Sequence, residues 1–128
     1  MGRYLVTGAA GFIASRVCEL LLADGHDVVG VDNLNQAYDV RLKEWRLARL
    51  QALPGFTFHR LDISDRAQLE ATLGGLPAVD AVVNLAARAG VRQSVEDPWV
   101  YVDTNVTGTL NLLDLCVRRG IGKLVLAS

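Results

Sequence analysis

The sequence predicts one α/β domain built on a parallel, doubly wound sheet of five strands. Short apolar runs of strand length alternate along the chain with longer segments of helical period. The connections are short, and right-handed crossovers then favour the strand order 3-2-1-4-5 with helices on both faces. The length of 128 residues suffices for one hydrophobic core and not for two. Residues 1–128 are therefore expected to form a single domain.

Five apolar runs supply the expected strands, at residues 4–7, 28–31, 56–61, 79–85 and 123–127. The last run contains Leu124-Val125-Leu126-Ala127, a pattern typical of a strand that is buried on both faces of a parallel sheet. No further strand or helix follows it in this sequence, so an apolar edge is expected to stay exposed. We therefore expect a dimer or larger homo-oligomer, formed through that edge or through the neighbouring helix.

Four segments of helical period connect the strands: residues 11–23, a segment between Asp39 and Pro54, residues 65–73 and residues 97–119. The expected inward-facing residues are Ile13, Val17, Leu20 and Leu21 in the first helix, and Leu42, Trp45 and Leu50 in the second. The last helix should begin at Asp97-Pro98, where the carboxylate can cap and the proline fits the first helical position. Gly120 is placed to end it.

Composition excludes several classes of protein. Thirteen basic and fourteen acidic residues give a net charge of −1 without a block of like charge, which predicts neither nucleic-acid nor membrane-surface binding. The apolar runs are too short to cross a bilayer, and the first residues do not resemble a signal peptide. Cys18 and Cys116 lie among apolar residues in helical patterns and are expected to be reduced. We expect a cytoplasmic protein without a metal site.

The first strand leads into a glycine-rich turn, Thr7-Gly8-Ala9-Ala10-Gly11-Phe12-Ile13-Ala14. Gly8 permits a tight turn, and Gly11 would let a pyrophosphate approach the backbone at the start of a helix. Ala14 stands where a small residue allows close packing of helix on strand. Glycines with this spacing also serve ordinary turns, but the strand before and the helix after are the context that a dinucleotide site requires.

The second strand ends at Asp32, 21 residues after Gly11. A carboxylate at this place can accept hydrogen bonds from the adenosine ribose hydroxyls and would repel a 2′-phosphate. No arginine occupies residues 33–37, so the sequence favours NAD over NADP. The alternative is that Asp32 and Asn33 only begin a turn.

Two more strand ends should lie near this site, because ligands of such sheets bind where the strand order reverses. The third strand is followed by Asp62-Ile63, placed to reach the adenine. The fourth ends in Asn84-Leu85-Ala86-Ala87, whose small residues would let the backbone lie against the cofactor. Plain packing explains these alanines equally well. Together these features predict a Rossmann-type domain.

These segments resemble the extended short-chain dehydrogenase/reductase family, whose members include NAD-dependent epimerases and dehydratases. The resemblance rests on Thr-Gly-x-x-Gly-Phe-Ile at residues 7–13, Asp32-Asn33-Leu34, Leu61-Asp62-Ile63 and Asn84-Leu85-Ala86-Ala87. Residues 32–43, 89–94 and 97–105 are closest to its UDP-glucuronate 4-epimerases, which act by transient hydride transfer at sugar C4. The family more often has histidine at position 84 and glutamine at position 88. Because Arg88 replaces that glutamine near the expected substrate site, the sequence leaves the identity of the sugar open.

The resemblance also implies roles for individual residues. The implied cofactor residues are Gly8, Gly11, Phe12 and Ile13 at the pyrophosphate, Asp32 and Asn33 at the ribose, Asp62 and Ile63 at the adenine, Leu85, Ala86 and Ala87 along the cofactor, and Asn105 in support. Gly90-Val91-Arg92 would begin the loop that binds a nucleotide-sugar substrate. In that loop Arg92 could meet a carboxylate or phosphate, or it could be a solvated cation.

Catalysis in the family depends on a Tyr-x-x-x-Lys pair, in which the lysine lowers the tyrosine pKa. The tyrosines of this sequence are residues 4, 38 and 101, and the residues four positions later are Gly8, Leu42 and Asn105. No catalytic residue is therefore expected in residues 1–128, which resemble the cofactor-binding part of a longer enzyme. By the same resemblance Ser128 would directly precede the catalytic serine, so a truncated chain lacking the substrate domain is expected. The alternatives are a non-catalytic nucleotide-binding module, or the same part of a nucleotide-sugar 4,6-dehydratase or reductase.

Overall fold

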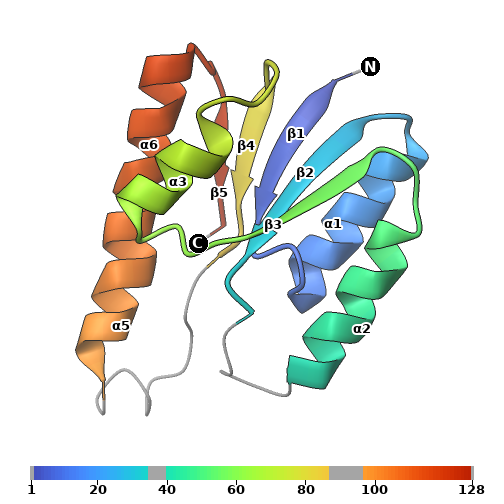
Figure 1. Cartoon of the computed structure of the whole chain (residues 1–128), viewed down its shortest axis with the longest axis horizontal. Helices are drawn as coiled ribbons and strands as arrows, with labels where there is room; N and C mark the ends of the chain where they lie inside the picture. The colour runs from blue at the N-terminus through green and yellow to red at the C-terminus, as the bar shows by residue number, and fades with distance from the viewer. Residues whose placement is uncertain (1, 35–39, 87–96, 128) are drawn as a thin grey trace.

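A computed structural model describes residues 2–34, 40–86 and 97–127. Five parallel strands form one sheet in the order β3-β2-β1-β4-β5, as the sequence predicts (Figure 1). The strands are β1 (Arg3–Thr7), β2 (Asp27–Asp32), β3 (Phe56–Arg60), β4 (Ala81–Asn84) and β5 (Leu124–Leu126). The fourth and fifth strands are shorter than expected, and the others agree closely.

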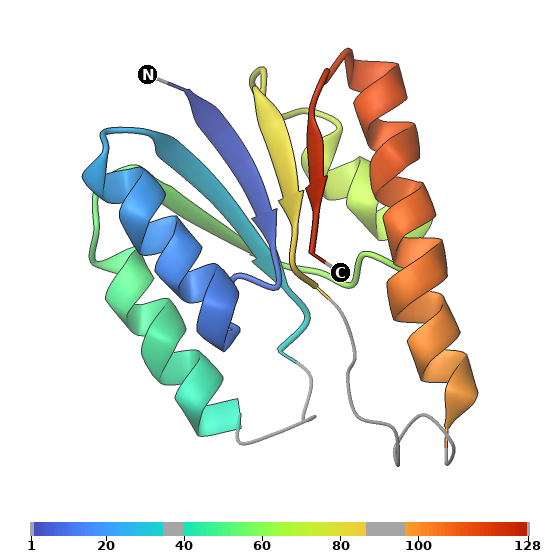
Figure 2. The same cartoon turned by 180° about the vertical axis from the view of Figure 1, so that it is seen from behind.

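The helices are α1 (Phe12–Ala23), α2 (Val40–Gln51), α3 (Arg66–Leu73), α5 (Pro98–Val102) and α6 (Gly108–Arg119), with a π-helical turn, η1 (Asp103–Thr107), between the last two. In both views α1 and α2 lie together on one side of the sheet, while α3, α5 and α6 lie on the other (Figures 1 and 2). The predicted doubly wound arrangement is confirmed.

Each face of the sheet has a hydrophobic core of its own. Under α3 and α6 the core includes Leu5, Leu69 and Leu112, each at most 1% exposed. Under α1 and α2 it includes Val6 and other buried residues of the first two strands and helices. Burying one such leucine or valine side chain contributes about 1.5–3 kcal/mol, so these two layers fix the positions of the strand ends.

α1 buries small residues against the sheet, and of the large residues that the sequence pattern favoured only Leu21 packs partly buried against this core. Ala14 and Cys18 are buried, whereas Ile13 is 66% and Leu20 is 52% exposed. The prediction of the inner face was therefore wrong for these two large residues. Small side chains allow the helix axis to approach the strands closely, because no large side chain has to fit between them.

The inner face of α2 also differs from the prediction. Lys43, Leu47 and Leu50 are buried, while Leu42 and Trp45 are 42% and 56% exposed. The prediction holds only for Leu50. A lysine on an inner face cannot be recognised by counting apolar residues, because its burial depends on a partner supplied by another part of the fold.

The chain is helical from residue 98 to residue 119, close to the predicted helix, but five residues in its middle form a π-helical turn. Thr109, in the first turn of α6, donates its hydroxyl to the carbonyl oxygen of Asn105 in the π-helical turn at 2.7 Å, a bond that competes with backbone pairing and loosens a helix. Pro98 occupies the first turn of α5 as expected, but Asp97 makes no side-chain capping bond. The fixed φ of proline therefore starts this helix.

Both cysteines are reduced and buried, as predicted, and they lie in the two different cores. Burial raises the pKa of the Cys18 thiol to about 12 and raises the pKa of Cys116. The thiolate is the reactive form, so we expect the folded chain at about pH 8 to resist iodoacetamide, and the urea-unfolded chain to react at both sites. Measuring labelling by intact mass checks this expectation.

The same thiol gives stability a pH dependence of known sign. A folded-state pKa of about 12 against an ordinary value of 9.0 means that the folded chain retains the proton longer than the unfolded chain. The resulting stabilisation is complete below about pH 9 and is lost as the pH rises toward 12. Rapid labelling of folded Cys18 near neutral pH would contradict both expectations.

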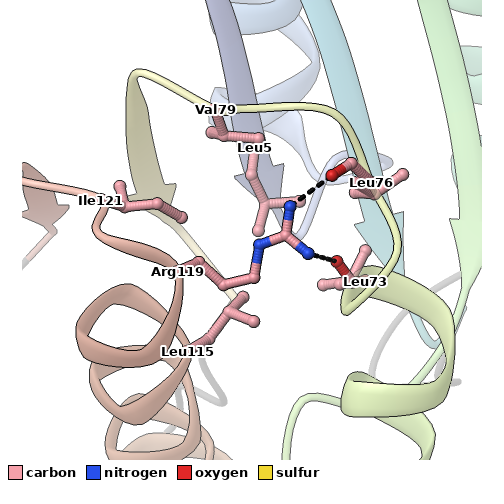
Figure 3. Close-up of a pocket in the computed structure, with 7 residues that line it drawn as sticks. All are labelled: Leu5, Leu73, Leu76, Val79, Leu115, Arg119 and Ile121. Atoms are coloured by element: carbon pink, nitrogen blue, oxygen red, sulfur yellow. Dashed lines mark hydrogen bonds between the residues drawn. The ribbon is translucent and has the colours of Figure 1, made fainter.

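An apolar cavity between α3 and α6 lies away from the carboxyl ends of the strands (Figure 3). Arg119 enters it and donates to the carbonyl of Leu73 at 3.4 Å and to those of Gly74 and Leu76. These bonds satisfy the last carbonyl of α3 and two carbonyls of the turn that follows it, so the arginine has a structural role there. In the described ranges, no helix has the length and apolar character to cross a membrane, and no cluster of His, Cys, Asp or Glu could hold a metal.

Candidate functional site

The carboxyl ends of β1, β2 and β4 meet at one edge of the sheet, where the arrowheads converge in Figure 1. β1 continues into α1 on one face, and the chain beyond β4 continues into helices on the other. This divergence between β1 and β4 is the switch point at which doubly wound sheets bind ligands. The predicted site residues of the first, second and fourth strands therefore come together here.

The turn between β1 and α1 requires glycine at its first position. Gly8 has a φ of +69°, a conformation that other residues adopt only with strain. A Cβ atom at Gly8 would lie 3.0 Å from the backbone of both Leu85 and Ala86. The Gly11 N–H closes the turn by donating to the Gly8 carbonyl at 2.8 Å. The backbone of the turn thus lies directly against the segment that follows β4.

The N-terminal end of α1 opens at the same edge. Gly11 precedes the helix in an extended conformation, and the Ser15 N–H donates to its carbonyl at 3.0 Å. The amides of Phe12 and Ile13 have no acceptor within the helix. Their side chains are 76% and 66% exposed. Unsatisfied amides and the positive end of the helix dipole together suit a phosphate group.

Asp32 stands at the end of β2, beside this turn, and is only 5% exposed. Its Oδ2 accepts from the Ala10 N–H at 3.1 Å, and its Oδ1 accepts from the Leu34 N–H at 2.7 Å. The second bond is the ordinary turn role that the sequence left open, and half-buried Asn33 lies within that turn. The first bond ties the carboxylate to the glycine-rich turn and goes beyond a turn role.

A lysine that sequence reasoning missed completes the surroundings of Asp32. The Lys43 ammonium donates to Oδ1 of Asp32 at 3.2 Å, and the two side chains are 8% and 3% exposed. A carboxylate offers about four acceptor positions, of which the hydrogen bonds described here occupy three. Counted over the described residues alone, one acceptor position is left that a ribose hydroxyl could use.

A hydrogen-bonded network joins β1 to the segment after β4. The buried Thr7 hydroxyl donates to Oδ1 of Asn84 at 2.6 Å and accepts from the amides of Leu85 and Ala86 at 3.1 and 3.0 Å. Asn84 Nδ2 in turn donates to the Thr109 hydroxyl at 3.3 Å. The predicted cofactor-lining residues are thus held by Thr7, which the sequence signalled only as a polar residue at the end of an apolar strand.

Asn105 is connected to the same network from the π-helical turn. Its carbonyl accepts from the Thr109 hydroxyl at 2.7 Å, and that hydroxyl accepts from Asn84. Because this contact uses the backbone carbonyl of Asn105, the supporting role that the resemblance implies for its side chain stays a prediction. Ala87, Val91 and Arg92 lie outside the described residues, so their roles stay predictions.

Asp62 and Ile63 follow β3 at the side of the site. Oδ1 of Asp62 accepts from the amide and the hydroxyl of Ser64 at 2.9 and 2.7 Å. The Ile63 side chain is 4% exposed and belongs to the core, and its carbonyl accepts from Asn111 at 2.8 Å. Contact with an adenine therefore stays a prediction for both residues, and for Ile63 it would depend on the backbone.

Residues 4–128 match the family described as "NAD dependent epimerase/dehydratase family". The match extends over the glycine turn, Asp32 and the network around Thr7. The chain belongs to this family. Its Rossmann-type fold and the predicted resemblance are both confirmed.

Individual relatives give the same picture. The chain is 58% identical, over its whole length, to the UDP-glucuronate 4-epimerase of Thermodesulfobacterium geofontis and spans 39% of that protein. A crystal structure of the Bacillus cereus UDP-glucuronic acid 4-epimerase in complex with UDP-glucuronic acid and NAD is 35% identical, with a TM-score of 0.82, over 97% of this chain and 39% of that one. The dTDP-glucose 4,6-dehydratase of Streptomyces venezuelae, with NAD and TYD bound, is 36% identical, with a TM-score of 0.80, over 95% of this chain and 38% of that one. The chain thus spans less than two-fifths of these relatives.

Proposed function

We propose that the chain is the NAD-binding portion of a nucleotide-sugar 4-epimerase that acts on UDP-glucuronate or a related UDP-sugar. The observation that carries this proposal is the buried Asp32 carboxylate, which is bonded to the glycine turn through Ala10 at 3.1 Å. An acidic residue at the end of β2 beside such a turn is the arrangement that recognises an adenosine ribose. The relative that is 58% identical and named UDP-glucuronate 4-epimerase supports the choice of sugar.

The described residues fit the adenosine and pyrophosphate parts of NAD. The amides of Phe12 and Ile13 would hold the pyrophosphate, and Asp32 would accept from a ribose hydroxyl. Gly8 lets the turn pack directly against the Leu85–Ala86 backbone, which a Cβ at this position would approach to 3.0 Å. In such an enzyme bound NAD supplies the reversible acceptance of a hydride from the sugar. These residues would bind and orient the cofactor, and they would take no part in moving protons.

The substrate end of the proposal rests on Val91 and Arg92. An arginine at that place would bind a sugar carboxylate or a diphosphate by charge-assisted hydrogen bonds. The remaining contacts would come from a segment corresponding to the part of the relatives that this chain does not span. The alternative function is that of a nucleotide-sugar 4,6-dehydratase. It is supported by the Streptomyces venezuelae dehydratase, which is 36% identical to this chain, about as similar as the Bacillus cereus epimerase at 35%.

Calorimetric titration of the 128-residue chain with NAD and with NADP tests the cofactor assignment. We expect NAD to bind more tightly than NADP, because Asp32 can accept from a ribose hydroxyl and repels a 2′-phosphate. We also expect weaker NAD binding than in a full-length relative, which has further groups for the nicotinamide end. Equal or tighter binding of NADP would refute the role given to Asp32.

A stripe of exposed apolar side chains on α5, η1 and α6 indicates a surface for oligomer formation. Six exposed apolar side chains follow one another at intervals of three or four residues: Trp99, Val102, Val106, Leu110, Leu113 and Val117. This stripe is typical of helices that pack against another helix. Two more exposed apolar residues, Val125 and Leu126, lie on the edge strand β5, and Figure 2 shows α6 beside β5.

We propose that this stripe pairs with the same stripe of a second copy, since a twofold axis makes one apolar surface complementary to itself. Light scattering of the wild-type chain should show a dimer. Leu110→Glu should give a monomer, because a charge buried in such an interface is costly. Leu20→Glu, at a comparably exposed leucine on α1 (52% against 62%), should leave the dimer intact. A wild-type chain that stays monomeric at high concentration would contradict the proposal.

A further inference from the structure

α2 brings two cations to the ribose end of the site. Lys43 Nζ lies 3.2 Å from Oδ1 of Asp32, with both side chains almost fully buried. One turn later the Arg46 guanidinium lies 3.4 Å from the Ala10 carbonyl oxygen and 5.5 Å from the centre of the Phe12 ring. A lysine is rarely buried unless its ammonium is paired, so the ion pair is a built feature of this site.

We propose that Lys43 is a specificity-determining residue for the cofactor: its ammonium offsets the Asp32 charge and lies where it can bind a 2′-phosphate. The proposal rests on the proposed NAD-binding function and deepens it. Its consequence is that Asp32 alone maintains the preference for NAD. Without that carboxylate, the same pocket favours NADP.

The geometry supports this proposal because the ribose hydroxyl and the Lys43 ammonium would both bind the Asp32 carboxylate. A ribose hydroxyl held by Asp32 lies one hydrogen bond from the carboxylate, and the Lys43 ammonium lies 3.2 Å from the same group. A phosphate ester on that hydroxyl would therefore lie within reach of the ammonium. The ammonium would attract such a phosphate and the carboxylate would repel it, so the ammonium offsets part of the repulsion. Removing the carboxylate leaves the attraction alone.

A structural role for Lys43 is the competing explanation. In that case the ion pair only fastens α2 to the end of β2, and loss of the lysine would affect both cofactors alike. The ratio of the two dissociation constants separates the explanations, because a structural change that weakens NAD and NADP equally does not move the ratio.

The test measures that ratio by calorimetry for the wild-type chain, Asp32→Asn and Asp32→Asn combined with Lys43→Met. We expect Asp32→Asn to move the ratio toward NADP by about tenfold or more, the size of a charge-assisted hydrogen bond. Lys43→Met in that background should reverse the shift, whereas Lys43→Arg should preserve it.

A control removes a cation from the same helix at a distance from the carboxylate. Arg49 is 55% exposed and lies 3.8 Å from Glu19, so Arg49→Met should leave the ratio unchanged. Replacing both members of a buried ion pair by neutral residues of similar size is generally tolerated, and circular dichroism verifies that the double variant is folded. If another variant does not fold, an Asp32→Asn chain that keeps the wild-type preference for NAD still overturns the inference.

Two results would overturn the inference by itself. One is an Asp32→Asn chain that keeps the NAD preference of the wild type. The other is an equal ratio in the Asp32→Asn chain with and without Lys43→Met, which would assign Lys43 a structural role only. A wild-type chain that binds neither cofactor would instead contradict the proposed function, and the inference with it.

Discussion

The 128-residue chain by itself is expected to show no detectable epimerisation of UDP-glucuronate or UDP-glucose. Oxidation at a sugar carbon requires a base that removes the hydroxyl proton, and the sequence has no Tyr-x-x-x-Lys pair. General base catalysis contributes about 10²–10⁴-fold, and lost positioning of the substrate removes more. A coupled assay of UDP-galacturonate formation from UDP-glucuronate, in the presence of NAD, measures this.

Neither histidine can replace the tyrosine. Nδ1 of His26 accepts from the Gly2 amide at 2.9 Å, before the start of β2 and far from the carboxyl ends of the strands. His59 lies within β3 opposite Val31, and its Nε2 is buried without a partner among the described residues. A histidine at either place cannot reach a sugar beside the nicotinamide.

A chimera supplies the matched positive control. Residues 1–128 joined to the remaining part of the Thermodesulfobacterium geofontis relative, which is 58% identical over the shared length, should epimerise UDP-glucuronate. The same chimera with the tyrosine of its Tyr-x-x-x-Lys pair changed to phenylalanine should not. Turnover by the 128-residue chain alone would contradict this expectation and would direct the search for a base to Asp103 and Tyr101.

Asp32→Ala is expected to weaken NAD binding by about 1.5–3 kcal/mol, the contribution of a hydrogen bond to a charged group. The carboxylate is held beside the glycine turn by Ala10 at 3.1 Å, so its loss removes the ribose contact and leaves the pyrophosphate contacts in place. Calorimetry should therefore show weaker and not abolished binding. The midpoint temperature of thermal unfolding should also fall, because the buried Lys43 loses its ion-pair partner.

Asp27→Ala is the control for this variant. Asp27 begins the same strand at its opposite end and forms an exposed ion pair with Arg3 at 3.6 Å. Its replacement removes an equal charge, and NAD affinity should not change. An Asp32→Ala chain that binds NAD as tightly as the wild type would show that the carboxylate has only its turn role toward Leu34.

The alternation of strand and helix periods was sufficient to predict the sheet order and both helical layers. The short connections leave few topologies open, because parallel neighbours require right-handed crossovers. The position of Asp32 beside the glycine turn was also predictable, since both follow strands that end at the same edge of the sheet. These features depend on patterns that are local in the sequence.

The features that the sequence did not predict depend on tertiary partners. Lys43 is buried because Asp32 lies opposite it at 3.2 Å, and no local pattern indicates that pairing. With Lys43 on the inner face of α2, Leu42 and Trp45 lie on the outer face of the helix and contact solvent. Thr7 links β1 to the segment after β4 across 77 or more residues of sequence, a distance at which hydrophobic periodicity carries no information.

NAD is expected to bind at the edge formed by the glycine turn and the end of β2. Titration of the ¹⁵N-labelled chain with NAD, followed by NMR, tests it most directly because it reports location as well as affinity. We predict saturable shifts of the amides of Gly8, Gly11, Phe12 and Leu34, with no change around Arg119 at the opposite end of the sheet. Absence of shifts, or shifts confined to the region of Arg119, would contradict this expectation.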